Sequence, residues 1–101
     1  MIEIRKSEKY LRWYGKLKDR TAKKRIQSRL LKLTEGYFGD VKPVGQGVSE
    51  FRIDYGPGYR VYYMQRGKSI VILLAGGDKS TQSKDIETAI QIAQSMNEEK
   101  R

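Results

Sequence analysis

Two alternating segments around a glycine-rich turn, followed by an entirely apolar run, limit most strongly what this chain can fold into. Residues 51–55 and 59–65 alternate in polarity, and Gly56-Pro57-Gly58 separates them. Alternation with a period of two predicts half-buried strands, and the glycine–proline sequence predicts a turn between them. The run from Ile70 to Ala75 predicts a central strand covered on both faces. Strands at about 48–55, 59–66 and 69–75 would form a meander.

A turn of three residues would fix the pairing of the first two strands. The opposed pairs are then Tyr55 with Tyr59, Ile53 with Val61, and Phe51 with Tyr63. All are apolar or aromatic, as one buried sheet face requires. The opposite face carries Arg52, Asp54, Arg60 and Tyr62. Two arginines and a tyrosine on one face suit contact with phosphates and bases, although a one-residue bulge at the glycines would shift this register.

The residue types that the chain lacks exclude several kinds of site. Its 101 residues include no cysteine and no histidine. Disulfides, thiolate zinc sites and a cysteine nucleophile are therefore excluded, and the commonest general base and metal ligand is missing. No carboxylate cluster suggests a metal-dependent nuclease. We therefore expect neither a metal nor another cofactor.

Length and hydropathy predict a single domain that spans residues 1–101. A chain of this length with 38% hydrophobic residues can form a core. No signal peptide is recognisable at the N-terminus, and the longest apolar run is far too short to cross a bilayer. We therefore expect a cytoplasmic protein with no membrane-bound segment.

Positive charge is concentrated in the first third of the chain. Residues 1–32 contain twelve basic and three acidic residues, a balance of +9, whereas residues 33–101 contain nine of each and sum to zero. A one-sided positive field favours a polyanionic partner, because it speeds association and releases counterions from nucleic acid. A solvated helix face is the alternative explanation.

Apolar spacing predicts three helices and a further strand outside the meander. The first five residues alternate as a strand would. Helical spacing predicts one helix from a Ser7 cap to about Leu17 and a second from a Thr21 cap to Gly36. A last helix is expected over about 85–96, before a polar tail that frays. Residues 36–47 read as a loop.

The resulting order, β-α-α-β-β-β-α, predicts an α+β domain. An N-terminal strand and a helical hairpin would pack on a mainly antiparallel twisted sheet, with a C-terminal helix at the end of the chain. We expect the helices mainly on one face of that sheet.

Three motifs occupy the second half of the chain. They are G-D-V-K-P-V-G at 39–45, S-E-F-R-I-D-Y-G-P-G-Y-R-V-Y-Y at 49–63, and L-L-A-G-G-D-K-S-T-Q at 73–82, and a D-I-x-x-A helix follows at 85–89. Together with the order of elements, they resemble the RelE/ParE toxin superfamily, in its phage-related addiction-module killer branch near the HigB-like toxins. The resemblance covers essentially the whole chain and implies a RelE-like fold.

This resemblance implies a bacterial type II toxin that a cognate antitoxin, often a helix-turn-helix DNA-binding protein, holds inactive. RelE-like members are ribosome-associated, metal-independent endonucleases of messenger RNA, in which the 2′-hydroxyl attacks its own 3′ phosphate and leaves a cyclic phosphate. ParE-like members instead inhibit DNA gyrase without nuclease activity. Cleavage of mRNA is our first interpretation. A gyrase inhibitor is the alternative, as is an inactive basic RNA-binding member.

Three cations are the candidate catalytic residues. Arg60 matches the family's phosphate-binding arginine, and a guanidinium can grip two phosphate oxygens and stabilise charge in the transition state. An ion pair with Asp54 is its alternative role. Lys79 matches a residue that stabilises the transition state or leaving group, and Arg52 matches a basic position that helps to bind RNA. Both could instead be solvated surface residues.

Two positions depart from the family pattern. Asp54 stands where members often carry a lysine or arginine, although an aspartate could act as a base. Asp85 lies near a position where some members use a tyrosine, and no tyrosine follows Tyr63.

Tyr62 could stack on an RNA base. The candidates for contact with ribosomal RNA are Lys16, Lys18, Lys23, Lys24 and Arg25.

Overall fold

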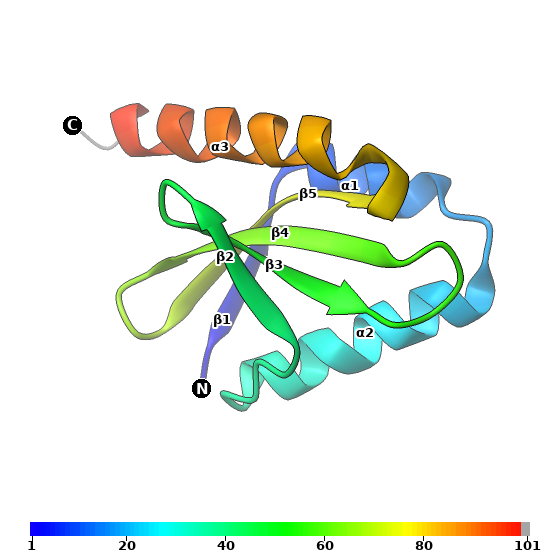
Figure 1. The fold of residues 1–101 in the computed structure, drawn as a ribbon. Coiled ribbons are helices and arrows are strands. Elements are labelled where there is room, and N and C mark those ends of the chain that lie inside the picture. Colours follow the sequence, from blue (N-terminus) through cyan, green and yellow to red (C-terminus); the bar gives the residue numbers. More distant parts are fainter. Residues whose placement is uncertain (100–101) are drawn as a thin grey trace.

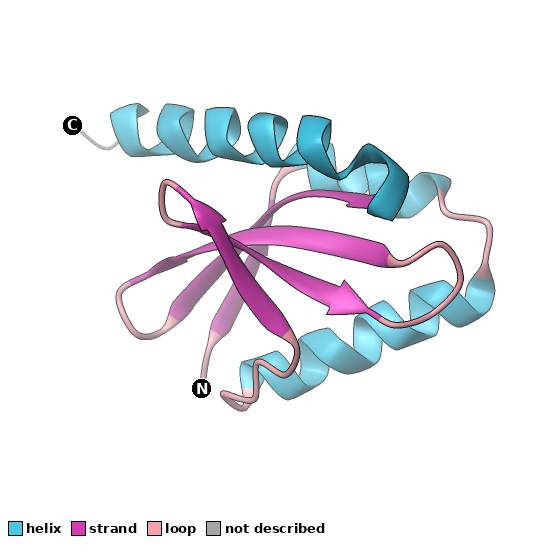
Figure 2. Ribbon diagram, viewed as in Figure 1, coloured by secondary structure: helices cyan, strands magenta, loops and turns pink. Residues whose placement is uncertain are grey.

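Residues 1–99, the part of the chain that the computed structural model describes, form one five-stranded sheet with helices on both faces (Figures 1 and 2). The strand order is β1-β5-β4-β3-β2, in which β1 runs parallel to β5 and every other pair is antiparallel. The strands are β1 (Glu3–Lys6), β2 (Val41–Gly45), β3 (Val48–Ile53), β4 (Tyr59–Arg66) and β5 (Ile70–Asp78).

The helices are α1 (Glu8–Lys16), α2 (Arg20–Thr34) and α3 (Gln82–Glu99), with a 3-10 turn, η1 (Lys79–Thr81), before α3. Ser7 caps α1 as predicted, because its hydroxyl accepts a hydrogen bond from the Tyr10 amide at 3.0 Å. The cap of α2 is Asp19, not Thr21, since the Asp19 carboxylate accepts from the amides of Thr21 and Ala22. Gly36, at φ +93°, follows the end of α2 as expected.

The sheet has a hydrophobic core on each face. On one face, Tyr10 of α1 and the apolar side of α2 pack against Phe51, Val61 and Leu73. On the other face, Ala89 and Ala93 of α3 pack over the even-numbered residues of the same strands, among them Tyr62, Ile72 and Leu74. The expectation of helices mainly on one face is therefore wrong. The expectation of a central strand covered on both faces is confirmed, and it explains why the first part of β5 is apolar throughout.

The register between β3 and β4 differs from the predicted one by two residues. Phe51 lies opposite Val61, and Ile53 lies opposite Tyr59. The connecting segment therefore has five residues, 54–58, instead of three. Because the side-chain period of a strand is two, an even shift keeps every side chain on its predicted face. Tyr55 leaves the strand, and its hydroxyl donates to the Asp19 carboxylate at 2.9 Å.

Two strands extend into segments that the sequence assigns to loops or turns. β2 lies inside the predicted loop at 36–47 and pairs with β3 at the sheet edge. β5 continues beyond its expected end at residue 75, through Gly76 and Gly77, as far as Asp78. At the C-terminus, α3 continues to Glu99, and the last two residues of the predicted tail lie outside the described part. Within residues 1–99, no helix has the length and apolar character needed to cross a membrane.

Candidate functional site

A pocket of about 370 Å³ opens beside the segment that joins β3 to β4. The side chains of Arg52, Arg60 and Lys79, the three predicted catalytic residues, all line it. The remaining lining residues are Asp40, Ile53, Asp54, Gly56, Pro57 and Gly58. Among residues 1–99, no cluster of three carboxylates is arranged to hold a metal ion.

Sheet register brings the three cations together. Arg52 and Arg60 are direct partners across β3 and β4. Lys79 follows the last residue of β5, and that residue pairs with Tyr59 at the start of β4. Three successive segments, β3, β4 and the residue after β5, therefore place one cation each at the same end of the sheet.

Arg60 is held by a glutamate that the sequence reasoning did not single out. Its Nε atom lies 3.0 Å from the Glu50 carboxylate, and its Nη1 atom donates to the carbonyls of Gly58 and Tyr59 at 3.1 and 3.3 Å. The Arg60 side chain is 13% exposed and that of Glu50 is 1% exposed. The alternative prediction for Arg60, an ion pair with Asp54, is therefore wrong, because its acidic partner is Glu50. The signal for Glu50 was its even position in β3, which places it on the same face as Arg52.

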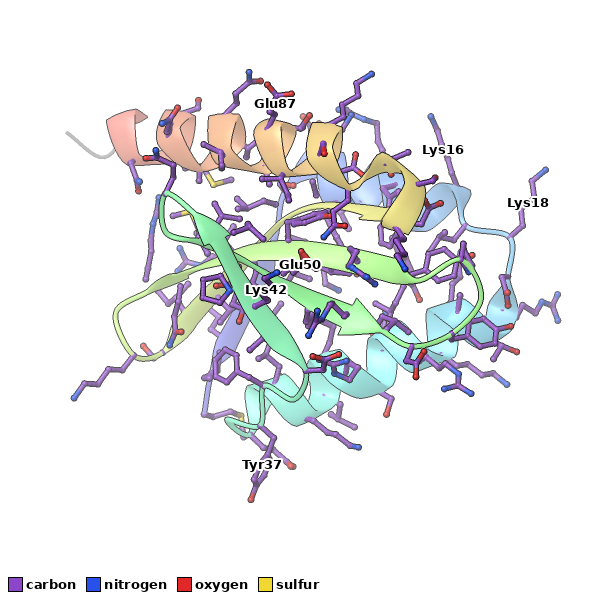
Figure 3. The ribbon with its side chains drawn as sticks, viewed as in Figure 1. Lys16, Lys18, Tyr37, Lys42, Glu50 and Glu87 are labelled. Atoms are coloured by element: carbon purple, nitrogen blue, oxygen red, sulfur yellow. The ribbon has the colours of Figure 1, made fainter. Side chains whose placement is uncertain are left out.

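Glu50 has a second partner at the start of α3. The Gln82 amide donates to the two oxygens of the Glu50 carboxylate at 2.8 and 3.3 Å. A buried carboxylate is stable only when a cation and hydrogen-bond donors replace the water that it loses. Arg60 and Gln82 provide these two kinds of contact. Figure 3 labels Glu50 near the centre of the sheet.

Arg52 has a looser partner. Its Nη2 and Nε atoms donate to one oxygen of Asp40 at 2.7 and 3.2 Å, and both side chains are well exposed. This hydrogen bond lowers the pKa of Asp40 and raises that of Arg52. An exposed pair of this kind contributes little to stability and exchanges readily with solvent. Arg52 is therefore held less firmly than Arg60.

Arg29 of α2 supports the wall of the pocket from behind. Its guanidinium donates to the backbone carbonyls of Arg52, Phe38 and Asp40, and it lies 5.3 Å from the centre of the Phe51 ring. These contacts join α2 to β3 and to the segment before β2. In the sequence, Arg29 is only one of the twelve basic residues at positions 1–32. Most other basic residues of α2 are exposed, and the half-buried position of Arg29 becomes recognisable only from the fold.

Gly58 lies close to both Arg60 and Lys79. A Cβ atom added there would be 3.4 Å from both Arg60 Nη1 and Lys79 Cβ, and the residue has φ +79°. The positive φ and the close approach both favour glycine. Lys79 itself is exposed, and among residues 1–99 no hydrogen bond or ion pair holds its ammonium group.

Tyr62 does not lie on the open face that we predicted for it. It is 0% exposed and packs in the core beneath α3, and this burial raises the pKa of its hydroxyl. Its ring therefore has no free surface on which an RNA base could stack, and that prediction is wrong. The error follows from the position of α3, which we expected on the other face of the sheet.

The five basic residues predicted to contact RNA lie on α1, α2 and the connection between them. Lys16 and Lys18 extend away from the sheet near this connection (Figure 3). Two of the five contact aromatic rings: Lys23 lies 4.9 Å from the Tyr14 ring centre, and Arg25 lies 4.8 Å from that of Tyr55. Contact of these residues with RNA remains a prediction.

Comparisons with known proteins agree on a family and a fold. Residues 16–97 match the family described as Phage derived protein Gp49-like (DUF891). A protein of Haemophilus influenzae, described only as uncharacterized, is 47% identical over 95 residues, which cover 94% of this chain and 96% of that protein.

Two solved structures from E. coli share the fold. A chain of the intact RelBE toxin–antitoxin complex aligns with a TM-score of 0.65 and 18% identity, covering 77% of this chain and 96% of that chain. A mutant of the toxin RelE in the free state aligns with a TM-score of 0.65 and 16% identity, covering 85% and 95%. The predicted RelE-like fold is thus confirmed, whereas the HigB-like branch stays a prediction. The chain belongs to the phage-derived Gp49-like family and has the fold of the RelE toxin.

Proposed function

We propose that this chain is the toxin of a type II toxin–antitoxin system and that it cleaves messenger RNA in the pocket of Arg52, Arg60 and Lys79. The observation that carries the proposal is the meeting of these cations, from three separate segments, around one pocket of about 370 Å³. Phosphoryl transfer needs positioned positive charge more than it needs a covalent protein group. The fold of a known toxin supports the same conclusion.

The pocket contains the groups that the reaction requires. The 2′-hydroxyl of the RNA attacks the adjacent phosphorus, the bond to the 5′ oxygen breaks, and a 2′,3′-cyclic phosphate forms. Arg60 and Arg52 bind the phosphate oxygens, whose negative charge grows in the transition state. Lys79 neutralises the departing 5′ oxygen or gives it a proton. Asp54, the lining carboxylate that Arg52 does not hold, takes the proton of the 2′-hydroxyl.

The basic first third of the chain supports action on the ribosome. Helices α1 and α2 present several of their lysines and arginines to solvent. A surface of this charge attracts the phosphate backbone of ribosomal RNA and speeds association. We propose that Lys16, Lys18, Lys23, Lys24 and Arg25 bind RNA outside the pocket.

The ends of the cleaved RNA test this chemistry. In one incubation, the purified chain is added to ribosomes programmed with a defined message. In a second, the chain is mixed with the isolated message alone, with and without EDTA. We expect cleavage on the ribosome that leaves a 2′,3′-cyclic phosphate and a 5′-hydroxyl, both identified by end-specific ligation. Products with a 5′-phosphate, or cleavage of isolated message that EDTA abolishes, would contradict the proposed chemistry.

Replacing Asp54 with asparagine is expected to slow cleavage about a hundredfold, because general-base catalysis typically contributes at least that factor. Asp54 is exposed, so the melting temperature should change little. Single-turnover cleavage on programmed ribosomes measures the effect. A variant as fast as the wild type would remove Asp54 from the reaction.

Inhibition of DNA gyrase without nuclease activity is the second candidate function. The ion pair between Arg60 and the buried Glu50 favours it, because this pair gives Arg60 a structural role that needs no RNA. A catalytically inactive RNA-binding member would fit the same observation.

We also propose that a cognate antitoxin, a helix-turn-helix DNA-binding protein, neutralises this chain in the cytoplasm. The solved RelBE complex, which pairs a toxin of this fold with its antitoxin, supports a partner of this kind. Co-expression with the product of the adjacent gene should restore growth and yield a complex on purification. Growth inhibition that persists, with no complex, would count against the partner.

A further inference from the structure

Arg60 is restrained at two of its three guanidinium nitrogens. Nε lies against Glu50 at 3.0 Å, and Nη1 is held by the carbonyls of Gly58 and Tyr59. Within residues 1–99, Nη2 has no hydrogen bond or ion pair, although Arg60 lines the pocket. The donor that remains is therefore the one that a pocket ligand can use.

We infer that Glu50 and Gln82 are positioning residues, which fix the Arg60 guanidinium in the orientation that binds a phosphate. The inference rests on the proposed function of the pocket and adds residues that touch no substrate. Glu50 is 1% exposed, so it cannot itself reach RNA. Its two contacts link Arg60 to the first residue of α3, Gln82.

Burial makes the ion pair of Arg60 and Glu50 a firmer restraint than the exposed pair of Arg52 and Asp40. Glu50 lies opposite Tyr62, which is 0% exposed, so water does not compete for its carboxylate from that side. A charge pair in such surroundings is much stronger than one in water. Arg52 and Asp40 are 38% and 56% exposed, and solvent weakens their pair. Arg60 is thus fixed, whereas Arg52 is free to move.

The Gln82 amide requires a hydrogen-bond acceptor at residue 50. Its nitrogen donates to the Glu50 carboxylate, which also forms an ion pair with Arg60. In Glu50→Gln, the side-chain oxygen can still face Arg60, but the new amide N–H groups then meet those of Gln82. Adding Gln82→Glu resolves this conflict, because the amide at position 50 can donate to the new carboxylate. The double variant therefore restores the hydrogen bond between positions 50 and 82, with the negative charge moved from position 50 to position 82.

The test follows the Arg60 Nε–H group directly by NMR on the full-length ¹⁵N-labelled chain, with the signal assigned by its loss in Arg60→Lys. In the wild type we expect this proton to exchange with solvent slowly. Glu50→Gln should speed the exchange about tenfold or more, and the double exchange with Gln82→Glu should recover most of the protection. Asp40→Asn is the matched control, because it changes an exposed carboxylate on the other pocket arginine, and it should leave the Arg60 signal unchanged.

Function is read separately. Titration with inorganic phosphate should perturb Arg60 in the wild type and bind about tenfold more weakly in Glu50→Gln. On programmed ribosomes, Glu50→Gln should lower kcat about tenfold with a smaller change in KM, since a misplaced group costs chiefly transition-state stabilisation. Gln82→Met leaves the ion pair of Arg60 and Glu50 in place and should lower kcat by a smaller factor. This variant replaces Glu50→Gln in the test if Glu50→Gln does not fold.

The outcomes separate this inference from the proposed function. Protection of Arg60 that is lost in Glu50→Gln, in a wild type that cuts no RNA, would uphold the positioning roles and contradict the nuclease. Rapid exchange of the Arg60 proton in the wild type would overturn the positioning roles whatever the activity. Equal kcat for the wild type and a folded Glu50→Gln variant would do the same.

Discussion

Replacing Arg60 with lysine is expected to slow RNA cleavage about a hundredfold while the protein stays folded. Lysine keeps the positive charge that the buried Glu50 carboxylate requires, but it lacks the planar fork that grips two phosphate oxygens. Single-turnover cleavage on programmed ribosomes gives the rate, and thermal unfolding gives the melting temperature. Alanine would be a poorer choice, because it leaves Glu50 without a cation, and breaking such a pair costs about 3–5 kcal/mol.

Arg5→Lys is the matched control for this change. Arg5 also lies on a strand and pairs with a glutamate, at 2.6 Å, but both side chains are at least half exposed and neither lines the pocket. Its cleavage rate should equal that of the wild type. If Arg60→Lys also cleaved at the wild-type rate, Arg60 would serve only as the structural partner of Glu50.

Replacing Gly76 with valine is expected to destabilise the fold by roughly 3 kcal/mol, at the upper end for overpacking. Strand propensity alone would favour valine at this position in β5. However, a Cβ atom on Gly76 would lie 2.2 Å from the Trp13 ring, much closer than atoms can approach. For a domain of about 100 residues, the melting temperature should fall by roughly 12–24 °C.

A second substitution tests the cause of that fall. Trp13→Ala in the Gly76→Val background should recover part of the lost stability, because it removes the ring that the valine strikes. Gly15→Ala in α1 is the matched control: its Cβ would meet nothing within 4 Å, so it should raise stability slightly. A Gly76→Val variant as stable as the wild type would show that Trp13 moves aside at no cost.

Local patterns predicted most of the elements of this fold. The period of two identified β3 and β4, and the apolar run identified β5, because a strand buried on both faces needs no polar residues. The Ser7 cap and the Gly36 stop were also recognisable from residue type. β2 was missed because glycines and a proline surround it, and its pairing with β3 is a tertiary contact.

Two of the errors share one physical origin, since each depends on which other segment covers the residue. Gly76 and Gly77 looked like a strand end, but they are small because Trp13 and Asp85 lie against them. Tyr62 looked available for RNA because the sequence does not tell which face α3 covers. Arg52, Arg60 and Lys79 line one pocket, yet the acidic partners of the two arginines, Asp40 and Glu50, are recognisable only from the fold.

The proposal that this chain is a messenger-RNA nuclease is tested most directly by pulse labelling after induced expression in bacteria. Incorporation of labelled methionine and thymidine is followed over the first minutes, for the wild type and for Arg60→Lys. We expect methionine incorporation to stop promptly while thymidine incorporation continues, and the variant to leave both unaffected. An early stop in thymidine incorporation, or equal toxicity of the wild type and Arg60→Lys, would contradict the nuclease and favour inhibition of gyrase.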